Sequence, residues 1–245
     1  MVDTAAKAPL SSSSIFIPQE SYAVPKHLPY PILDGGEELK LMKDGFLPIG
    51  WSRDGKFAFA TEPSDEACGC YFFTIAVQDM ISDKVLWSWS YSSDTEGNDT
   101  DRSSMDLRKL WKQKQAEFTR QLNRYQINPI SFEQVMSLPI REQGNLFTFS
   151  LKNQTIEQDG FDRVALTKLY RKLNGGSDKV LFSNDYLSGD SYSGIMSNGI
   201  CGYLRSPYES RIALLYYDKS WGYEGPPHVI SVTPVGADIS INGSK

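Results

Sequence analysis

The side chains that most often carry out catalysis are scarce in this chain of 245 residues. It contains two histidines, His27 and His228, and three cysteines. Nucleophilic catalysis usually needs a base such as histidine beside the nucleophile, and zinc sites are built mainly from cysteine and histidine. We place His27 in a flexible leader, which leaves His228 as the plausible histidine base in the folded part. The composition therefore argues against metal-dependent and histidine-based mechanisms.

Serine hydrolase chemistry would need a Gly-x-Ser-x-Gly nucleophile elbow at a turn from a strand into a helix. The nearest match is made by Gly189, Ser191 and Gly194, where the last glycine is one residue out of register and no helix pattern follows. The 30 acidic residues could also supply a catalytic carboxylate pair, but the sequence does not show which of them converge. A hydrolase that uses Ser191, with His228 as its base, or a carboxylate pair is the alternative function.

The cysteines lack the spacing of a zinc site, in which about two to four residues separate two thiolates. In an extended strand, Cys68 and Cys70 would lie too far apart for an easy disulfide with each other. Cys201 could bridge to either of them if the two segments were adjacent. We expect small buried or half-buried thiols, with a structural disulfide as the alternative. The acidic stretch 94–101 lacks the glycine and glutamate positions of an EF-hand loop, so no metal is assigned.

Charge and hydropathy exclude two further classes of partner. The net charge is −5 and no large basic block is present, whereas nucleic-acid binding needs clustered Lys and Arg. Neither a Gly-x-Gly-x-x-Gly motif nor a phosphate-binding loop occurs, so we assign no nucleotide and no other cofactor. No apolar run reaches the roughly 18–20 residues of a membrane-spanning helix, and no signal peptide is visible.

The hydrophobic pattern predicts an α+β fold that is mainly antiparallel β. Short runs rich in aromatic and β-branched residues are typical of strands. They cover residues 57–60, 71–77, 85–91, 146–151, 164–170, 179–182, 200–204, 211–217 and 229–233. The first three fit an antiparallel meander over residues 38–91, and Asn174-Gly175-Gly176 favours a hairpin connection. The strands therefore form meander sheets in two halves of the chain.

One long amphipathic helix is predicted at about 103–127, between the two β halves. Ser103 and Asp106 have the spacing of a capping box, an apolar stripe follows, and Asn128-Pro129 ends the helix. The rest of the helix surface is basic, and this face is a candidate docking surface for an anionic partner as well as an ordinary solvated face. The residues that we single out on it are Arg108, Lys112 and Arg120.

The first 36 residues have a different composition from the rest of the chain. They are rich in proline and serine and lack hydrophobic periodicity, which is typical of a flexible segment. An extended arm along the domain surface is the alternative. We expect a single mainly-β domain over residues 37–240.

Two tight turns share a local pattern in the two halves of the chain. Ser52-Arg53-Asp54-Gly55-Lys56 and Ser206-Pro207-Tyr208-Glu209-Ser210-Arg211 each run from a serine through a turn to a basic residue and an apolar strand. The pattern resembles the turns of β-propeller blades. A complete propeller is not expected, because about 154 positions separate the copies and blades repeat every ~40–50 residues.

The order of these motifs resembles a family of predicted secreted bacterial proteins of unknown function. The resemblance covers roughly residues 45–236, from the first serine turn through the basic helix to Trp221-Gly222-Tyr223. It implies an extracytoplasmic, periplasmic or secreted, location and no particular chemistry.

Aromatic residues concentrate near the C-terminal end, where a glycine- and proline-rich loop could expose them. Large rigid aromatic side chains with a polar edge dominate recognition surfaces, although strand tyrosines can also simply fill a core. The candidate ligand-binding residues are Tyr203, Tyr208, Trp221 and Tyr223. The sequence thus favours a non-catalytic extracytoplasmic binding or interaction module whose partner is a protein or a cell-envelope component. Its ligand and oligomeric state are not specified.

Overall fold

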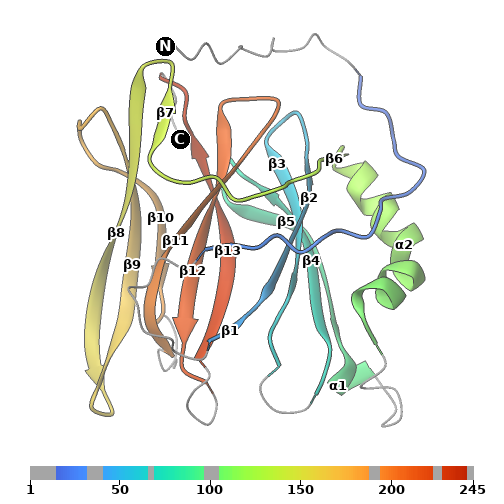
Figure 1. The fold of residues 1–245 in the computed structure, drawn as a ribbon, viewed down its shortest axis with the longest axis horizontal. Helices are drawn as coiled ribbons and strands as arrows, with labels where there is room; N and C mark the ends of the chain where they lie inside the picture. The colour runs from blue at the N-terminus through green and yellow to red at the C-terminus, as the bar shows by residue number, and fades with distance from the viewer. Residues whose placement is uncertain are drawn as a thin grey trace.

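The protein consists of three β-sheets and one long helix, stacked as four layers (Figure 1). The computed structural model describes residues 15–31, 41–65, 69–96, 105–187, 194–222 and 228–241. The first sheet has the order β5-β4-β3-β2-β6, the central sheet β1-β13-β12-β11 and the outer sheet β10-β9-β8-β7. Helix α2 covers the face of the first sheet that points away from the central sheet (Figure 1).

The elements follow one another along the chain with few long connections. The first sheet contains β2 (Gly45–Trp51), β3 (Lys56–Glu62), β4 (Phe72–Asp79), β5 (Lys84–Ser92) and β6 (Asn128–Pro129). The central sheet contains β1 (Leu41–Lys43), β11 (Ile195–Arg205), β12 (Arg211–Ser220) and β13 (His228–Asp238). The outer sheet contains β7 (Ile140–Glu142), β8 (Asn145–Gln158), β9 (Phe161–Leu173) and β10 (Lys179–Asp185). The helices are α1 (Ser93–Glu96) and α2 (Leu107–Arg124).

Strand β12 of the central sheet is buried on both faces, and its residues 212–217 are therefore a continuous apolar run. Along β12, Ile212 and Leu214 point into the layer shared with the outer sheet, while Ala213 and Leu215 point into the layer shared with the first sheet. This alternation follows from the two-residue period of a strand. All pairings in the three sheets are antiparallel except that of β1 with β13, which is parallel. The predicted mainly antiparallel β class is confirmed, and each predicted strand from 146–151 onward lies in an observed strand.

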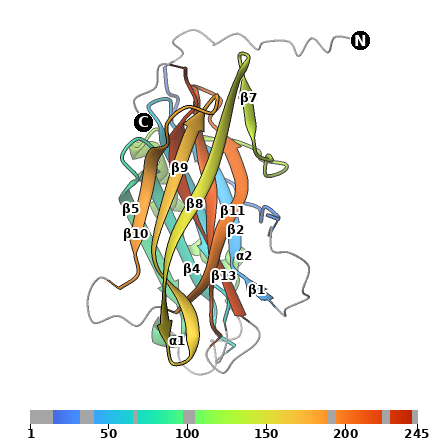
Figure 2. The same ribbon diagram turned by 90° about the vertical axis from the view of Figure 1, so that its left-hand side faces the viewer.

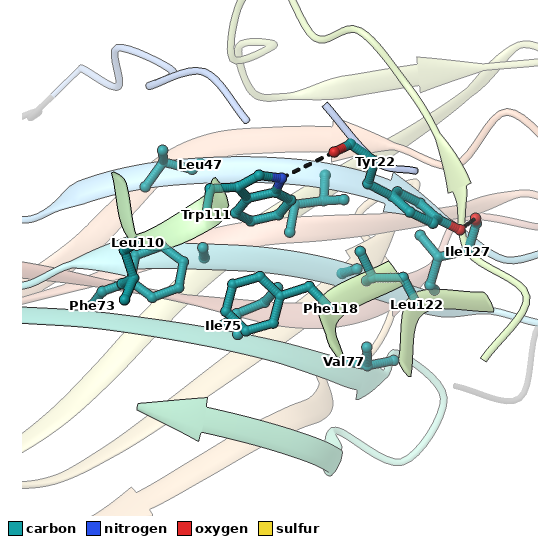
Figure 3. Packing of buried hydrophobic residues seen from close by; sticks show 13 residues of the cluster. Tyr22, Leu47, Phe73, Ile75, Val77, Leu110, Trp111, Phe118, Leu122 and Ile127 are labelled. Atoms are coloured by element: carbon teal, nitrogen blue, oxygen red, sulfur yellow. Dashed lines mark hydrogen bonds between the residues drawn. The ribbon is translucent and has the colours of Figure 1, made fainter. Parts of the chain in front are cut away.

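Helix α2 packs on the first sheet through one apolar stripe (Figure 3). Leu110, Trp111, Phe118 and Leu122 are each at most 1% exposed and contact the sheet in a cluster with Phe73. The aromatic rings of Phe118 and Phe73 lie 6.1 Å apart. The predicted helix is therefore present, but it begins at Leu107 instead of 103, because Asp106 is the N-cap and accepts a hydrogen bond of 2.9 Å from the Lys109 N–H. It ends at Arg124, three residues before the predicted end.

Part of the predicted flexible leader is an extended arm packed against the domain. Within residues 15–31, Tyr22 is 1% exposed and Leu28 is 4% exposed. The Tyr22 hydroxyl donates to the Ile127 carbonyl, and its own carbonyl accepts the indole N–H of Trp111 at 3.0 Å. These residues therefore correspond to the surface arm of the alternative and not to a free tether. Residues 1–14 and 32–36 lie outside the described part of the chain.

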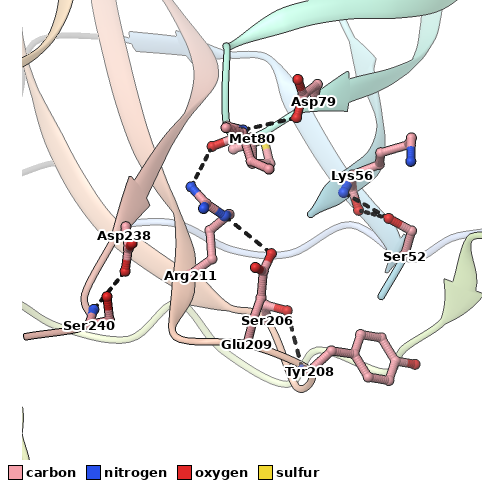
Figure 4. A network of polar contacts seen from close by, with 11 residues as sticks. Ser52, Lys56, Asp79, Met80, Ser206, Tyr208, Glu209, Arg211, Asp238 and Ser240 are labelled. Atoms are coloured by element: carbon pink, nitrogen blue, oxygen red, sulfur yellow. Dashed lines mark hydrogen bonds and ion pairs between the residues drawn. The ribbon is translucent and has the colours of Figure 1, made fainter. Parts of the chain in front are cut away.

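The two serine turns lie at the same end of the molecule, where they join the first and central sheets (Figure 4). The Lys56 N–H donates to the Ser52 hydroxyl at 2.8 Å, which closes the β2–β3 hairpin. The Ser206 N–H donates to the Arg211 carbonyl at 2.9 Å, which closes the β11–β12 hairpin. The buried Arg211 guanidinium then reaches the Met80 carbonyl of the first sheet at 3.1 Å. The shared pattern therefore corresponds to two hairpins that stabilise one inter-sheet junction.

Candidate functional site

A hollow lies between the arm, the start of α2 and the first sheet, and we call it the arm pocket. Its volume is about 710 Å³. It is lined by Val24, Pro25, Lys26, His27, Glu62, Tyr71, Met105, Asp106, Leu107 and Arg108. This volume is in the range of pockets that hold small organic ligands, roughly 300–1,000 Å³.

The Glu62 carboxylate is the polar centre of the arm pocket. One of its oxygens accepts the Tyr71 hydroxyl at 2.6 Å, and the other pairs with Nε2 of His27. The Glu62 side chain is 15% exposed, whereas the His27 ring is 57% exposed. Burial and the hydrogen bond to Glu62 raise the pKa of Tyr71 well above its usual range, so its hydroxyl stays protonated as a donor. The carboxylate is therefore held in one position by two different elements.

Local structure explains how distant residues meet at this point. Glu62 is the last residue of β3, and Tyr71 directly precedes β4, its neighbour in the sheet. The arm brings His27 over Gly45, where an added Cβ would lie 2.8 Å from the imidazole ring. A side chain at position 45 would therefore make the exposed imidazole shift from its place beside Glu62. Asp106 lies on the opposite wall because it caps α2.

The side chains that line the pocket could bind a ligand, transfer a proton or act as a catalytic carboxylate pair. Val24, Pro25, Met105 and Leu107 provide apolar walls, and no serine or cysteine is among the lining residues. Two carboxylates, Glu62 and Asp106, and two cations, Lys26 and Arg108, line the same space. A ligand that carries both a positive and a negative group, beside an apolar body, would match this arrangement. Within the described residues, no group of three or more His, Cys, Asp or Glu side chains could hold a metal ion.

The aromatic residues selected from the sequence do not come together. Tyr203 is 5% exposed and lies in the core between the central and outer sheets, so it fills the interior and does not present a surface. Tyr208 lies before β12, where the Arg53 guanidinium is 5.0 Å from its ring centre. Trp221 follows the other end of β12, and ten strand residues separate the two by about 30 Å. Tyr223 lies outside the described residues.

Trp221 lies in an aromatic and cationic cluster at its end of the molecule. Its ring centre is 5.0 Å from those of Phe161 and His228, and the Arg163 guanidinium is 5.8 Å away. The indole N–H is buried and has no hydrogen-bond partner in the structure. His228 is 3% exposed, as the first residue of β13, and Ser191 lies outside the described residues. His228 packs against Trp221, and its Nδ1 accepts the Gly222 N–H at 3.4 Å.

The basic residues predicted on the helix are exposed. Arg108, Lys112 and Arg120 all point away from the sheet, and Arg108 also lines the arm pocket. No described helix is long and apolar enough to cross a membrane.

The cysteines agree with the expected buried thiols at Cys201 and with the alternative, a disulfide, at Cys70. Cys201 is a buried free thiol, and burial raises its pKa to about 12. Cys70 is disulfide-bonded, so its bridge is not to Cys201. The argument against a bridge at Cys68-Gly69-Cys70 assumed an extended strand, but Gly69 has a φ of 63° and β4 begins only at Phe72. That premise is therefore wrong. Cys68 lies outside the described residues.

A polar cluster between the central and outer sheets also escaped the sequence argument. The hydroxyls of Tyr186 and Tyr216 donate to one oxygen of Asp218 at 2.6 and 2.7 Å. Burial raises the pKa of Asp218 above its usual range, although the two tyrosine hydrogen bonds oppose this shift. The cluster fixes Tyr186 against β12 and thereby ties the end of β10 to the central sheet.

The residues that define the arm pocket were also missed. His27 was assigned to a flexible leader, and Glu62 and Tyr71 were not distinguished from other polar residues. One signal was available in the sequence, because Leu28 and Tyr30 are apolar and two positions apart, which is typical of an extended segment with one packed face. Both side chains are buried in the structure. This spacing predicts that His27 belongs to a packed segment, but it does not predict that His27 meets Glu62.

Comparisons of this sequence and structure with family models, curated proteins and solved structures give no match. The geometry of the site is therefore the basis for a functional proposal.

Proposed function

We propose that the protein is a non-catalytic binding module that takes a small zwitterionic ligand, such as a short apolar peptide, in the arm pocket. The observation that supports this proposal is the fixed Glu62 carboxylate inside a pocket of about 710 Å³ with apolar walls. A preformed pocket with a few convergent polar groups is the usual form of a small-molecule site.

The charges of the lining suggest how such a ligand would be oriented. Its ammonium group would be attracted to Glu62 and Asp106, and its carboxylate to Lys26 and Arg108 at the exposed rim. Its apolar side chains would contact Leu107 and the other apolar walls. Because the rim charges are exposed, we expect the half-buried Glu62 to contribute more to affinity than Lys26 or Arg108.

The proposal can be tested by ligand-detected NMR with three related probes. These are leucyl-leucine, its N-acetyl form, which lacks the ammonium group, and its amide form, which lacks the carboxylate. We expect the free dipeptide to bind, and the N-acetyl form to bind at least about fivefold more weakly, a difference of about 1 kcal/mol. Glu62→Gln should weaken the free dipeptide by a similar factor. Failure of all three probes to bind at millimolar concentration would refute the proposal.

A matched control is available on the outer sheet. Glu157 is an exposed glutamate of β8 and does not line the arm pocket. Glu157→Gln removes the same charge and should leave binding of the free dipeptide unchanged. An equal loss of affinity in Glu157→Gln and Glu62→Gln would point to a general charge effect and would contradict the assignment of Glu62.

The extracytoplasmic location is part of the same proposal and rests on the resemblance of short motifs alone. Fractionation of the cells that produce the protein tests it directly. Recovery only with cytoplasmic markers would contradict it.

A hydrolase that uses a carboxylate pair is the second candidate, because Glu62 and Asp106 line one pocket. Glycoside hydrolysis uses two such groups, one as an acid and one as a base or nucleophile. A screen with chromogenic glycosides distinguishes the candidates: activity that is lost in both Glu62→Gln and Asp106→Asn would favour the enzyme. Asparagine is also a good N-cap, so Asp106→Asn should leave α2 intact.

A further inference from the structure

Most sheet edges in the described part of the chain are short or interrupted. Strand β6 has two residues and includes Pro129, and β1 and β7 have three residues each. Strands β10 and β11 are longer, but each has at least one register shift in its pairing. Short strands, prolines and bulges are devices that prevent an edge from pairing with another chain.

Strand β5 is the exception, because it is a nine-residue edge of the first sheet (Figure 2). Its only register shift is near its start, where Leu86 is an extra residue between Val85 and Trp87. The Leu86 carbonyl is covered there, since it accepts the Tyr125 hydroxyl of α2 at 2.9 Å. From Trp87 to Tyr91 the strand has no charge, no proline and no register shift.

The pairing of β4 with β5 shows which backbone groups face outward. The Ser93 N–H donates to the Tyr71 carbonyl, which makes this pair a hydrogen-bonded one. Hydrogen-bonded and non-hydrogen-bonded pairs alternate along an antiparallel ladder. Trp87 and Trp89 therefore direct their backbone groups toward β4, whereas Ser88 and Ser90 direct theirs away from it.

Among the described residues, the outward N–H and C=O groups of Ser88 and Ser90 have no partner. The Leu86 carbonyl, two residues before Ser88, also points away from β4, because it accepts the Tyr125 hydroxyl. A row of such groups at strand spacing is complementary to the backbone of another extended chain.

Charges of both signs lie near this edge, but two cations flank its open stretch. The Lys114 ammonium lies 5.1 Å from the centre of the Trp89 ring, and the Arg124 guanidinium lies 5.8 Å from the ring of Tyr125, which covers Leu86. Glu117 is the acidic partner of Lys114, at 3.8 Å. At the two ends of the strand the charges balance, since Asp79 lies opposite Lys84 in the ladder and the exposed Asp94 follows the strand. Beside Trp87–Tyr91 itself, Lys114 and Arg124 outnumber Glu117.

This charge distribution distinguishes between possible occupants. Pairing with β5 of a second copy around Trp89 would bring the two Lys114 side chains close together, and like charges at such a distance repel. An extended segment with acidic side chains would instead place its carboxylates beside Lys114 and Arg124.

We propose that the Trp87–Tyr91 edge of β5 binds an extended acidic segment of a partner protein, which adds to the first sheet as a sixth strand. The outward groups of Ser88 and Ser90 would pair with the backbone of the segment. Lys114 and Arg124 would select acidic side chains. This interaction is separate from ligand binding in the arm pocket, which lies on other residues.

The test uses a fluorescein-labelled peptide, Glu-Val-Glu-Val-Glu-Val-Glu, and its lysine counterpart, Lys-Val-Lys-Val-Lys-Val-Lys, in fluorescence anisotropy titrations at low salt. We expect the acidic peptide to bind, added salt to weaken it, and the lysine peptide to bind at least about tenfold more weakly. No binding of the acidic peptide, or equal binding of the two peptides, overturns the proposal.

Two variants test the position of the peptide. Ser90→Pro removes an outward N–H and the exposed hydroxyl contact with Thr74 at 3.0 Å, and it keeps the backbone ladder to β4, as prolines on edge strands do. It should reduce the affinity of the acidic peptide at least about tenfold. Ser88→Glu keeps every backbone N–H, and its carboxylate should repel the same peptide. This variant therefore tests the same position if Ser90→Pro fails to fold.

The matched control lies on β10. The Tyr186 N–H donates to the Ala165 carbonyl, so the alternation places the N–H of Ser183 on the outward side of that edge. Ser183→Pro and Ser183→Glu should leave peptide binding unchanged. Binding that survives both β5 variants overturns the proposal, as does self-association of the unliganded protein that Ser90→Pro abolishes, since it would assign the edge to a second copy.

Discussion

Tyr22 offers a direct test of whether the arm is an integral part of the fold. Its side chain is 1% exposed, and its hydroxyl donates to the Ile127 carbonyl at the end of α2, with Asn123 Oδ1 3.3 Å away. Tyr22→Phe keeps the ring and removes this donor. A buried acceptor that loses its partner costs about 1–3 kcal/mol, so we expect a loss of about 2 kcal/mol. In a chain of this size, that loss lowers the Tm by roughly 4–8 °C.

Urea unfolding followed by tryptophan fluorescence measures the effect, because Trp111 donates its indole N–H to the Tyr22 carbonyl and reports on the same junction. Tyr170→Phe is the control: the Tyr170 hydroxyl makes no hydrogen bond with the described residues, and the Lys152 ammonium lies 4.5 Å from the centre of its ring. It should change the stability by less than about 0.5 kcal/mol. If Tyr22→Phe were as stable as the wild type, the arm would not be held as described, and the wall of the arm pocket would lose its support.

Two further substitutions test other parts of the structure. Gly236→Ala would place a Cβ 1.9 Å from the Met80 carbonyl oxygen, so we expect a loss of about 3 kcal/mol in urea unfolding, whereas Gly194→Ala, which meets open space, should be nearly neutral. Asp218 has a raised pKa, so the stability that it contributes is present below its unfolded pKa of about 3.9 and is lost as the pH rises through the folded pKa. The side chain at this position in the Asp218→Asn variant cannot ionise, so the variant should not lose this stability. The urea midpoint of the variant minus that of the wild type should therefore increase as the pH rises from about 4 to about 8, and a constant difference would contradict this.

Local patterns predicted the elements of this fold better than their arrangement. The run Ile212–Tyr217 identified β12 because a strand that is buried on both faces needs apolar residues at every position. The stripe of Trp111, Phe118 and Leu122 identified α2, but the capping-box spacing misplaced its start, since Asp106 itself provides the cap. Which strand pairs with which depends on contacts between remote segments. The parallel pairing of β1 with β13 has no local signal.

The same limit explains why the sequence did not reveal the candidate site. The aromatic residues Tyr208 and Trp221 are close in sequence, but β12 separates them in space. His27 and Glu62 are 35 positions apart, and only the packing of the arm brings them together. Proximity in sequence was therefore a poor guide to the site, because each functional side chain is placed by a different element.

The two edges of the first sheet differ in a way that connects the arm to the proposed role of β5. The edge at β2 is covered, since β6 pairs with Gly50 and Trp51 and the Leu28 N–H of the arm donates to the Phe46 carbonyl at 2.8 Å. The arm also contributes buried residues to both faces of this sheet, Tyr22 on the side of α2 and Leu28 on the side of the central sheet. At the opposite edge, the Leu86 carbonyl of β5 accepts the Tyr125 hydroxyl, and the outward backbone groups of Ser88 and Ser90 have no partner among the described residues. Since the chain covers one edge with a dedicated segment, the open edge is where an added strand from outside would complete the sheet.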